Sequence, residues 1–135
     1  ATMQQAPRYD DVIGEVANFL GERVASAEAA GIPLNRIAVD PGFGFGKSLE
    51  HNIELLRRLG ELTVPGLPLM VGMSRKSMLG EITGRKVSLR DTASVAAALL
   101  AARNGARILR VHDVKATVEA LAVAGAATDP RSTEF

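Results

Sequence analysis

The segment RIAVDPGFGFGK, residues 36–47, is an apolar run with a β-strand pattern that ends in an aspartate and a glycine-rich turn. Two later segments share this layout, LMVGMSRKS at residues 69–77 and ILRVHD at residues 108–113. They recur at the spacing of a βα unit, roughly 30–40 residues. Because the strands of a parallel sheet open at their carboxyl ends on one face, we expect the polar residues that follow the three strands to form one site.

The segments around these strands have helical periodicity. Apolar residues recur at helical spacing over residues 10–30, after Ser48, and in an alanine-rich stretch that ends at Asn104-Gly105. The pattern predicts an α/β fold with parallel strands at 36–40, 68–73 and 107–111.

We expect Ser48 to cap the helix that follows it, and helix caps can be assigned at two further places. SLRD at residues 88–91 resembles a capping box, with Asp at its last position. Asp113 can cap a last helix that ends near Gly125. We expect the tail, residues 128–135, to be flexible.

Composition narrows the class of protein. The 135 residues carry a net charge of +1 and include no cysteine. The balanced charge gives no general attraction to nucleic acid or membranes, and neither a disulfide framework nor a thiolate metal site is possible. No apolar run approaches the roughly 20 residues of a membrane span, and the first residues lack the layout of a signal peptide. The expected class is a cytoplasmic enzyme or a part of one.

The glycine-rich turn invites comparison with a phosphate-binding loop. The pattern G-x-x-x-x-G-K-[ST] needs glycine at position 41, but Pro41 stands there and has no N–H to offer a phosphate. A plain flexible loop remains an alternative. The functional interpretation depends on Asp40, which ends the strand, and on Phe43 and Phe45, which we expect to form apolar loop tips.

The SRKS turn at residues 74–77 combines two hydroxyls and two cations at the start of a predicted helix, which favours an anion. The alternative is a solvated basic turn. Gly72 just before the turn allows a flat ligand to approach the strand.

Arg110 and His112 alternate along the last strand, so they share one face. We expect Arg110 to be buried and therefore to need an anion. That anion is either a phosphate or, as a core ion pair, Asp113. His51 is interpreted as an ordinary helix-surface residue, and two distant histidines give a weak metal signal.

Taken together, DPGFGFGK at 40–47, SRKS at 74–77 and RVHD at 110–113 resemble the dihydropteroate synthases of folate biosynthesis. The resemblance spans nearly the whole chain. These enzymes are (β/α)8 barrels that join 7,8-dihydropterin-6-ylmethyl diphosphate to p-aminobenzoate, giving dihydropteroate and diphosphate. Sulfonamides compete for the aminobenzoate site. A related family of pterin-binding methyltransferases is not expected to carry the SRKS turn.

The resemblance implies a role for each motif residue. Asp40 accepts hydrogen bonds from the amino-pyrimidine edge of the pterin, and Lys76 donates to pterin acceptors. Arg110 lies along the pterin ring and contacts the diphosphate, which His112 also binds. The implied catalytic residues are Lys76, Arg110 and His112.

The implied aminobenzoate site uses the same turn. Ser77 holds the carboxylate of aminobenzoate, and Phe45 and the stem of Lys76 form the walls. Arg75 supports this region, and Gly72 lies beside the pterin.

A (β/α)8 barrel needs roughly 250 residues. The resemblance therefore implies that residues 1–135 form one partial domain, about strands 6–8 at the C-terminal end of a barrel. The Mg²⁺ ligands are expected in the missing N-terminal part and none in this chain, and the family implies a homodimer. Two hypotheses remain: a transferase, of which these residues alone do not turn over substrate, or a non-catalytic α/β fragment that only binds pterin or an anion, or pairs with a complementary chain.

Overall fold

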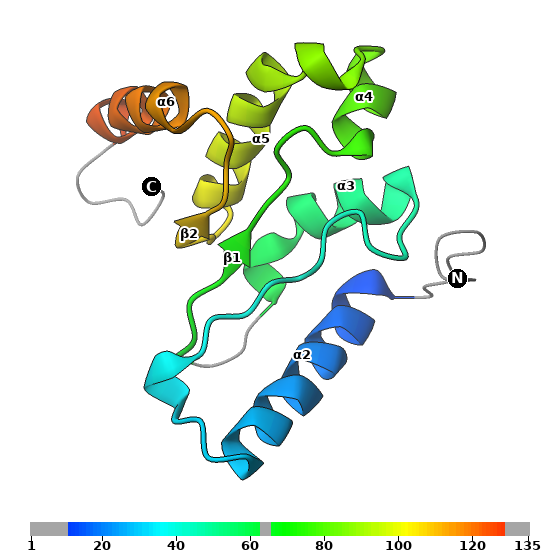
Figure 1. Ribbon diagram of the computed structural model, residues 1–135, viewed down its shortest axis with the longest axis vertical. Helices are drawn as coiled ribbons and strands as arrows, with labels where there is room; N and C mark the ends of the chain where they lie inside the picture. The colour runs from blue at the N-terminus through cyan, green and yellow to red at the C-terminus, as the bar shows by residue number, and fades with distance from the viewer. Residues whose placement is uncertain (1–10, 63–65, 129–135) are drawn as a thin grey trace.

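The computed structural model describes residues 11–62 and 66–128 and shows two short strands with helices packed beside them (Figure 1). Most of the predicted flexible tail lies outside these residues. In chain order the helices and strands are α2 (Val12–Ala29), α3 (Leu49–Arg57), β1 (Met70–Val71), α4 (Ser77–Thr83), α5 (Asp91–Arg103), β2 (Ile108–Leu109) and α6 (Val114–Ala127). Short 3₁₀ turns lie at Leu34–Arg36, Leu59–Glu61 and Val87–Leu89.

The predicted strand order is confirmed, but the strands are shorter than expected. β1 pairs in parallel with β2, with Met70 opposite Ile108, and Val39 forms a single parallel bridge to Leu69. The first strand is reduced to this bridge between the 3₁₀ turn at Leu34–Arg36 and Pro41, which has no N–H for a ladder. The fold is α/β, with parallel strands.

Helix starts follow local side-chain chemistry. Ser48 caps α3 and Asp113 caps α6 by accepting from the Ala116 N–H at 3.0 Å, both as predicted. The capping box predicted at 88–91 is wrong. Residues 87–89 form a 3₁₀ turn, and α5 starts after Arg90 without a side-chain cap, because Ser88 is inside that turn.

Alternation along the strands separates a packed face from an open one. Val39, Leu69, Val71 and Met73 are buried in the core with the helices. Residues of the opposite parity, such as Ile108, point away from the helices and stay accessible. The helices pack in succession, α2 on α3, α3 on α4, α4 on α5 and α5 on α6, so the open face is left for the polar residues.

None of the helices within residues 11–62 and 66–128 is both long and apolar enough to cross a bilayer.

Candidate active site

Asp40 begins the site at the end of the first strand. Its Oδ1 accepts the N–H of Gly42 at 2.8 Å, which starts the turn. Gly42, Gly44 and Gly46 all have positive φ, so the alternating glycines give the loop a backbone path that other residues adopt at a cost. Phe45 is 71% exposed and forms the predicted apolar tip. Phe43 is in the core instead, so its prediction as a tip is wrong.

The glycine-rich loop is held by side chains close to it in sequence. Lys47 Nζ donates to the carbonyls of Gly42 at 2.8 Å and Phe45 at 2.9 Å. The buried Asn52 accepts the N–H of Gly44 at 2.8 Å. Burial lowers the pKa of Lys47, and the nearby Asp40 carboxylate opposes that shift.

Lys76 reaches across from the basic turn to this loop. Its Nζ donates to the Phe43 carbonyl at 2.8 Å. Burial lowers the pKa of Lys76, Asp40 opposes the shift, and Arg110 lowers the pKa further. One ammonium group therefore responds to both the carboxylate of the first strand and the guanidinium of the last, which places all three charges in one region.

Arg110 lies over Gly72 on the open face. A Cβ built on Gly72 would lie 2.9 Å from both Nε and one terminal nitrogen of the guanidinium, so any other residue there would require the guanidinium to shift. The prediction that Arg110 is buried is wrong, because no element among the described residues covers this side of β2. Asp113 caps α6 rather than forming a core ion pair with Arg110.

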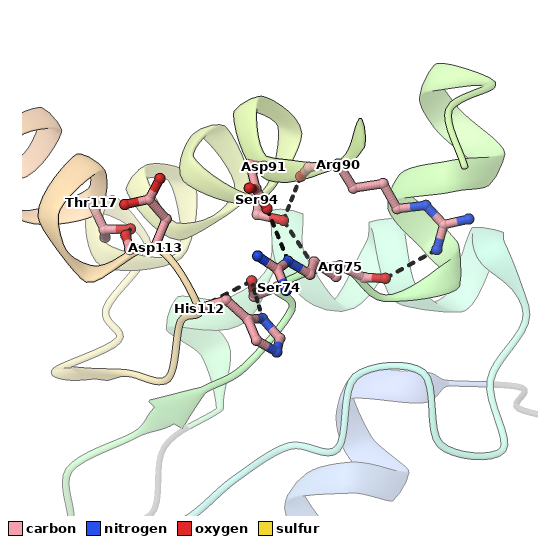
Figure 2. A network of polar contacts seen from close by, with 8 residues as sticks. All are labelled: Ser74, Arg75, Arg90, Asp91, Ser94, His112, Asp113 and Thr117. Atoms are coloured by element: carbon pink, nitrogen blue, oxygen red, sulfur yellow. Dashed lines mark hydrogen bonds and ion pairs between the residues drawn. The ribbon is translucent and has the colours of Figure 1, made fainter. Parts of the chain in front are cut away.

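His112 is fixed by the basic turn. Its Nδ1 lies 2.7 Å from the hydroxyl of Ser74, and its backbone N–H donates to the same oxygen at 3.4 Å (Figure 2). A cavity of about 270 Å³ opens beside this pair. It is lined by Gly72, Ser74, Lys76, Arg110, Val111 and His112.

A second, more apolar cavity of about 400 Å³ is lined by Asp40 and the glycine-rich loop on one side and by α2 on the other. Phe19 and Phe45, both exposed, contribute to its wall together with Pro41 and the stem of Lys47. The 270 Å³ cavity is thus lined by cationic side chains and the 400 Å³ cavity by mainly apolar ones, and the two share no lining residue.

The structure groups the predicted residues unequally. Four of the predicted residues line the 270 Å³ cavity, namely Gly72, Lys76, Arg110 and His112, and two line the 400 Å³ cavity, Asp40 and Phe45. Arg75 and Ser77 line neither. Arg75 pairs with Asp91 through Nε at 2.9 Å, and the exposed Ser77 is the first residue of α4.

Sequence reasoning missed several supporting residues. Ser94 and Asn52 are polar residues buried within otherwise apolar helix faces, and that contrast was the available signal. His51 is more than a surface residue, because its Nδ1 accepts the Ser48 N–H at 3.2 Å and completes the cap of α3. Nothing in the pattern linked Ser74 to His112, which are 38 residues apart.

In the part of the chain that the structure describes, no three histidine, cysteine, aspartate or glutamate side chains are grouped so that they could hold a metal ion. The described residues therefore do not fit a Mg²⁺ site.

Parallel strands with polar and charged residues after their carboxyl ends have the arrangement of the ligand-binding edge of an α/β protein. The profile of the pterin binding enzyme family matches residues 1–112, and the chain belongs to that family.

Within the family the relatives found are dihydropteroate synthases. The Escherichia coli K12 enzyme is 54% identical over 122 residues, which are 90% of this chain and 43% of that protein. A Yersinia pestis dihydropteroate synthase structure with a sulfonamide drug superposes with a TM-score of 0.89 at 49% identity, covering 93% of this chain and 46% of that one. The Xanthomonas albilineans enzyme in complex with 7,8-dihydropteroate gives 0.86 at 53% identity, over 91% and 48%. The chain spans less than half the length of these relatives.

Proposed function

We propose that the protein carrying this chain is a dihydropteroate synthase, a transferase of folate biosynthesis. It joins 7,8-dihydropterin-6-ylmethyl diphosphate to p-aminobenzoate. The observation that carries the proposal is the 270 Å³ cavity lined by Lys76, Arg110 and His112, where Lys76 also contacts the glycine-rich loop that follows Asp40. The relatives crystallised with dihydropteroate and with a sulfonamide support the same ligands here.

In this proposal the pterin lies between the first and last strands. Asp40 uses a carboxylate oxygen as acceptor for the N–H groups of the amino-pyrimidine, while its Oδ1 also holds Gly42. Lys76 donates to the ring acceptors, and Arg110 lies along the ring over Gly72. A charged acceptor and a charged donor on one ring edge select a heterocycle that has both kinds of group.

The chemistry is displacement of diphosphate by an amine. The C–O bond breaks with its electron pair leaving on the diphosphate, and the amine lone pair of aminobenzoate forms the new C–N bond before the nitrogen loses a proton to solvent. Arg110 and His112 are placed to stabilise charge on the departing diphosphate. No covalent intermediate with the protein is needed, and the walls hold the amine in line with the carbon.

The aminobenzoate is proposed to lie between the exposed Phe45 of the glycine-rich loop and the start of α4. Phe45 and the stem of Lys76 flank its ring, and Ser77 binds the carboxylate. Arg75 contributes by shaping the turn, since its side chain is paired with Asp91.

Three finer points belong to the same proposal. The chain corresponds to about strands 6–8 of a (β/α)8 barrel, and Mg²⁺ ligands come from elsewhere in the barrel. The protein is a homodimer and works in the cytoplasm. Sedimentation velocity on the whole protein tests the dimer.

The test of function uses the whole protein that carries this chain. Diphosphate release should require both substrates, and a sulfonamide should compete with aminobenzoate. Asp40→Asn keeps an oxygen for the Gly42 turn but replaces the charged acceptor, so pterin affinity should fall by about 1.5–3 kcal/mol. Asp11→Asn, at the cap of α2, is the matched control. Unchanged pterin affinity in Asp40→Asn removes that residue from the role.

A further inference from the structure

Both the backbone and the side chain of Arg75 contact residues at the beginning of α5. Its N–H donates to the hydroxyl of Ser94 at 2.9 Å, and its carbonyl accepts from a terminal nitrogen of Arg90 at 3.0 Å. Its side chain pairs with Asp91. Figure 2 shows these three contacts converging on one residue from one helix end.

The backbone at Arg75 needs such support. Its φ is +60°, and among the described residues it is the one non-glycine in that region. A side chain in this conformation carries strain that the surroundings have to hold in place. Arg75 lies between Ser74 and Lys76, so its backbone conformation sets the direction of both neighbouring side chains. One is the Ser74 hydroxyl, which contacts His112, and the other is the Lys76 ammonium, which donates to the Phe43 carbonyl.

The donors and acceptors in the hydrogen bonds of Ser94 can be assigned. It is 6% exposed, and its hydroxyl donates its one proton to the Arg90 carbonyl at 2.6 Å. The bond to Arg75 must then run from the Arg75 N–H to a lone pair of Ser94. The Arg75–Asp91 pair, in contrast, is 41% and 47% exposed at its two side chains, where an ion pair contributes little.

We infer that Ser94 is a positioning residue for the site: it holds Arg75 in the left-handed conformation and thereby directs Ser74 and Lys76 into the 270 Å³ cavity. Ser94 itself lines neither cavity. The identity of the ligand in this inference rests on the proposed function. The contact between α5 and the basic turn does not depend on it.

The chain offers a matched control in α6. Thr117 is 4% exposed, and its hydroxyl donates to the Asp113 carbonyl four residues earlier at 2.8 Å, the same bond that Ser94 makes within α5. No bond from Thr117 to the basic turn exists among the described residues. Ser94→Ala and Thr117→Val therefore remove equivalent helix bonds, and only the first also removes the link to Arg75.

The experiment measures two quantities on the whole protein and both variants. Hydrogen exchange by mass spectrometry reports the turn, and calorimetry with a pterin analogue and with inorganic diphosphate reports binding. In Ser94→Ala, peptides covering residues 73–77 should exchange about tenfold faster, and affinity should fall about tenfold, the size of one lost hydrogen bond. In Thr117→Val, faster exchange should be confined to α6, with affinity unchanged.

The outcomes separate the two proposals. Unchanged exchange at 73–77 in Ser94→Ala, or unchanged affinity despite faster exchange, overturns the positioning role. An equal loss of affinity in Thr117→Val also overturns it, because general helix weakening then explains the effect. If the unaltered protein binds neither probe, the proposed function fails, and exchange at 73–77 still decides whether Ser94 holds the turn.

Discussion

The glycine-rich loop and the basic turn meet at one site but are held in opposite ways. The loop, residues 40–48, is fixed by neighbours two to eight residues away, including Lys47 and Asn52. The turn, residues 74–77, has one local backbone bond, from the Lys76 N–H to the Met73 carbonyl at 3.1 Å. Its other contacts come from residues 15 to 38 positions away, namely Arg90, Ser94 and His112.

This difference has consequences for how each part fails. Contacts between near neighbours form with little loop-closure entropy, whereas distant contacts exist only when the surrounding helices are packed. We expect the glycine-rich loop to keep its shape when α5 is disturbed and the basic turn to lose it. The bond from Lys76 Nζ to the Phe43 carbonyl is the described point where the two parts join.

The largest effect on binding is expected at Gly72, which lies beneath the Arg110 guanidinium. Gly72→Ala places a methyl group against the Arg110 guanidinium, so the arginine must move off the strand. Loss of its charged contact with a bound diphosphate should weaken binding by about 1.5–3 kcal/mol. Calorimetry with diphosphate measures the change.

Gly21→Ala in α2 is the control for that substitution, because nothing lies within 4 Å of its added Cβ. It should stabilise the protein by about 0.5–1 kcal/mol and leave binding unchanged. Full diphosphate affinity in Gly72→Ala would show that Arg110 does not depend on the missing Cβ.

Asn52→Leu should disturb the locally held part alone. The substitution removes the acceptor of the Gly44 N–H from a site that is 3% exposed. We expect a loss of about 1–2 kcal/mol in the free energy of unfolding. Hydrogen exchange should rise in residues 42–46 and stay constant in 74–77. Equal increases in both segments would mean that the two parts are not independent.

Asp91→Asn should have a small effect on the turn. The ion pair with Arg75 is half-exposed, so its loss should cost about 0.2–1 kcal/mol, less at high salt. Urea unfolding at low and high salt measures this. If hydrogen exchange at residues 73–77 rises as much in Asp91→Asn as in Ser94→Ala, the positioning role belongs to the ion pair instead.

The smallest signal is expected from pH. The folded-state pKa of Lys76 is lowered, so between that pKa and the ordinary value of 10.5 the unfolded chain binds more protons than the folded one. The contribution of Lys76 to stability should therefore rise with pH across that window. Lys76→Met should remove this rise, which unfolding curves at several alkaline pH values can measure. An unaltered slope in the variant would assign the titration to another group, such as Lys47.

The same contrast explains what the sequence could predict. The caps at Ser48 and Asp113, the strand order and the shared face of Arg110 and His112 follow from local pattern and from strand alternation. The exposure of Arg110 and the burial of Phe43 could not be predicted that way, because each depends on which element covers a face. The hydrogen bond from Arg75 to Ser94 joins residues 19 positions apart and leaves no local pattern in the sequence.

The most direct test of the proposed site is a crystal structure of the whole protein with the pterin diphosphate bound. We predict that the amino-pyrimidine edge lies within hydrogen-bond distance of Asp40 and Lys76, and that the diphosphate lies against Arg110 and His112. A pterin bound away from Asp40, or a diphosphate held only by the glycine-rich loop, would contradict it.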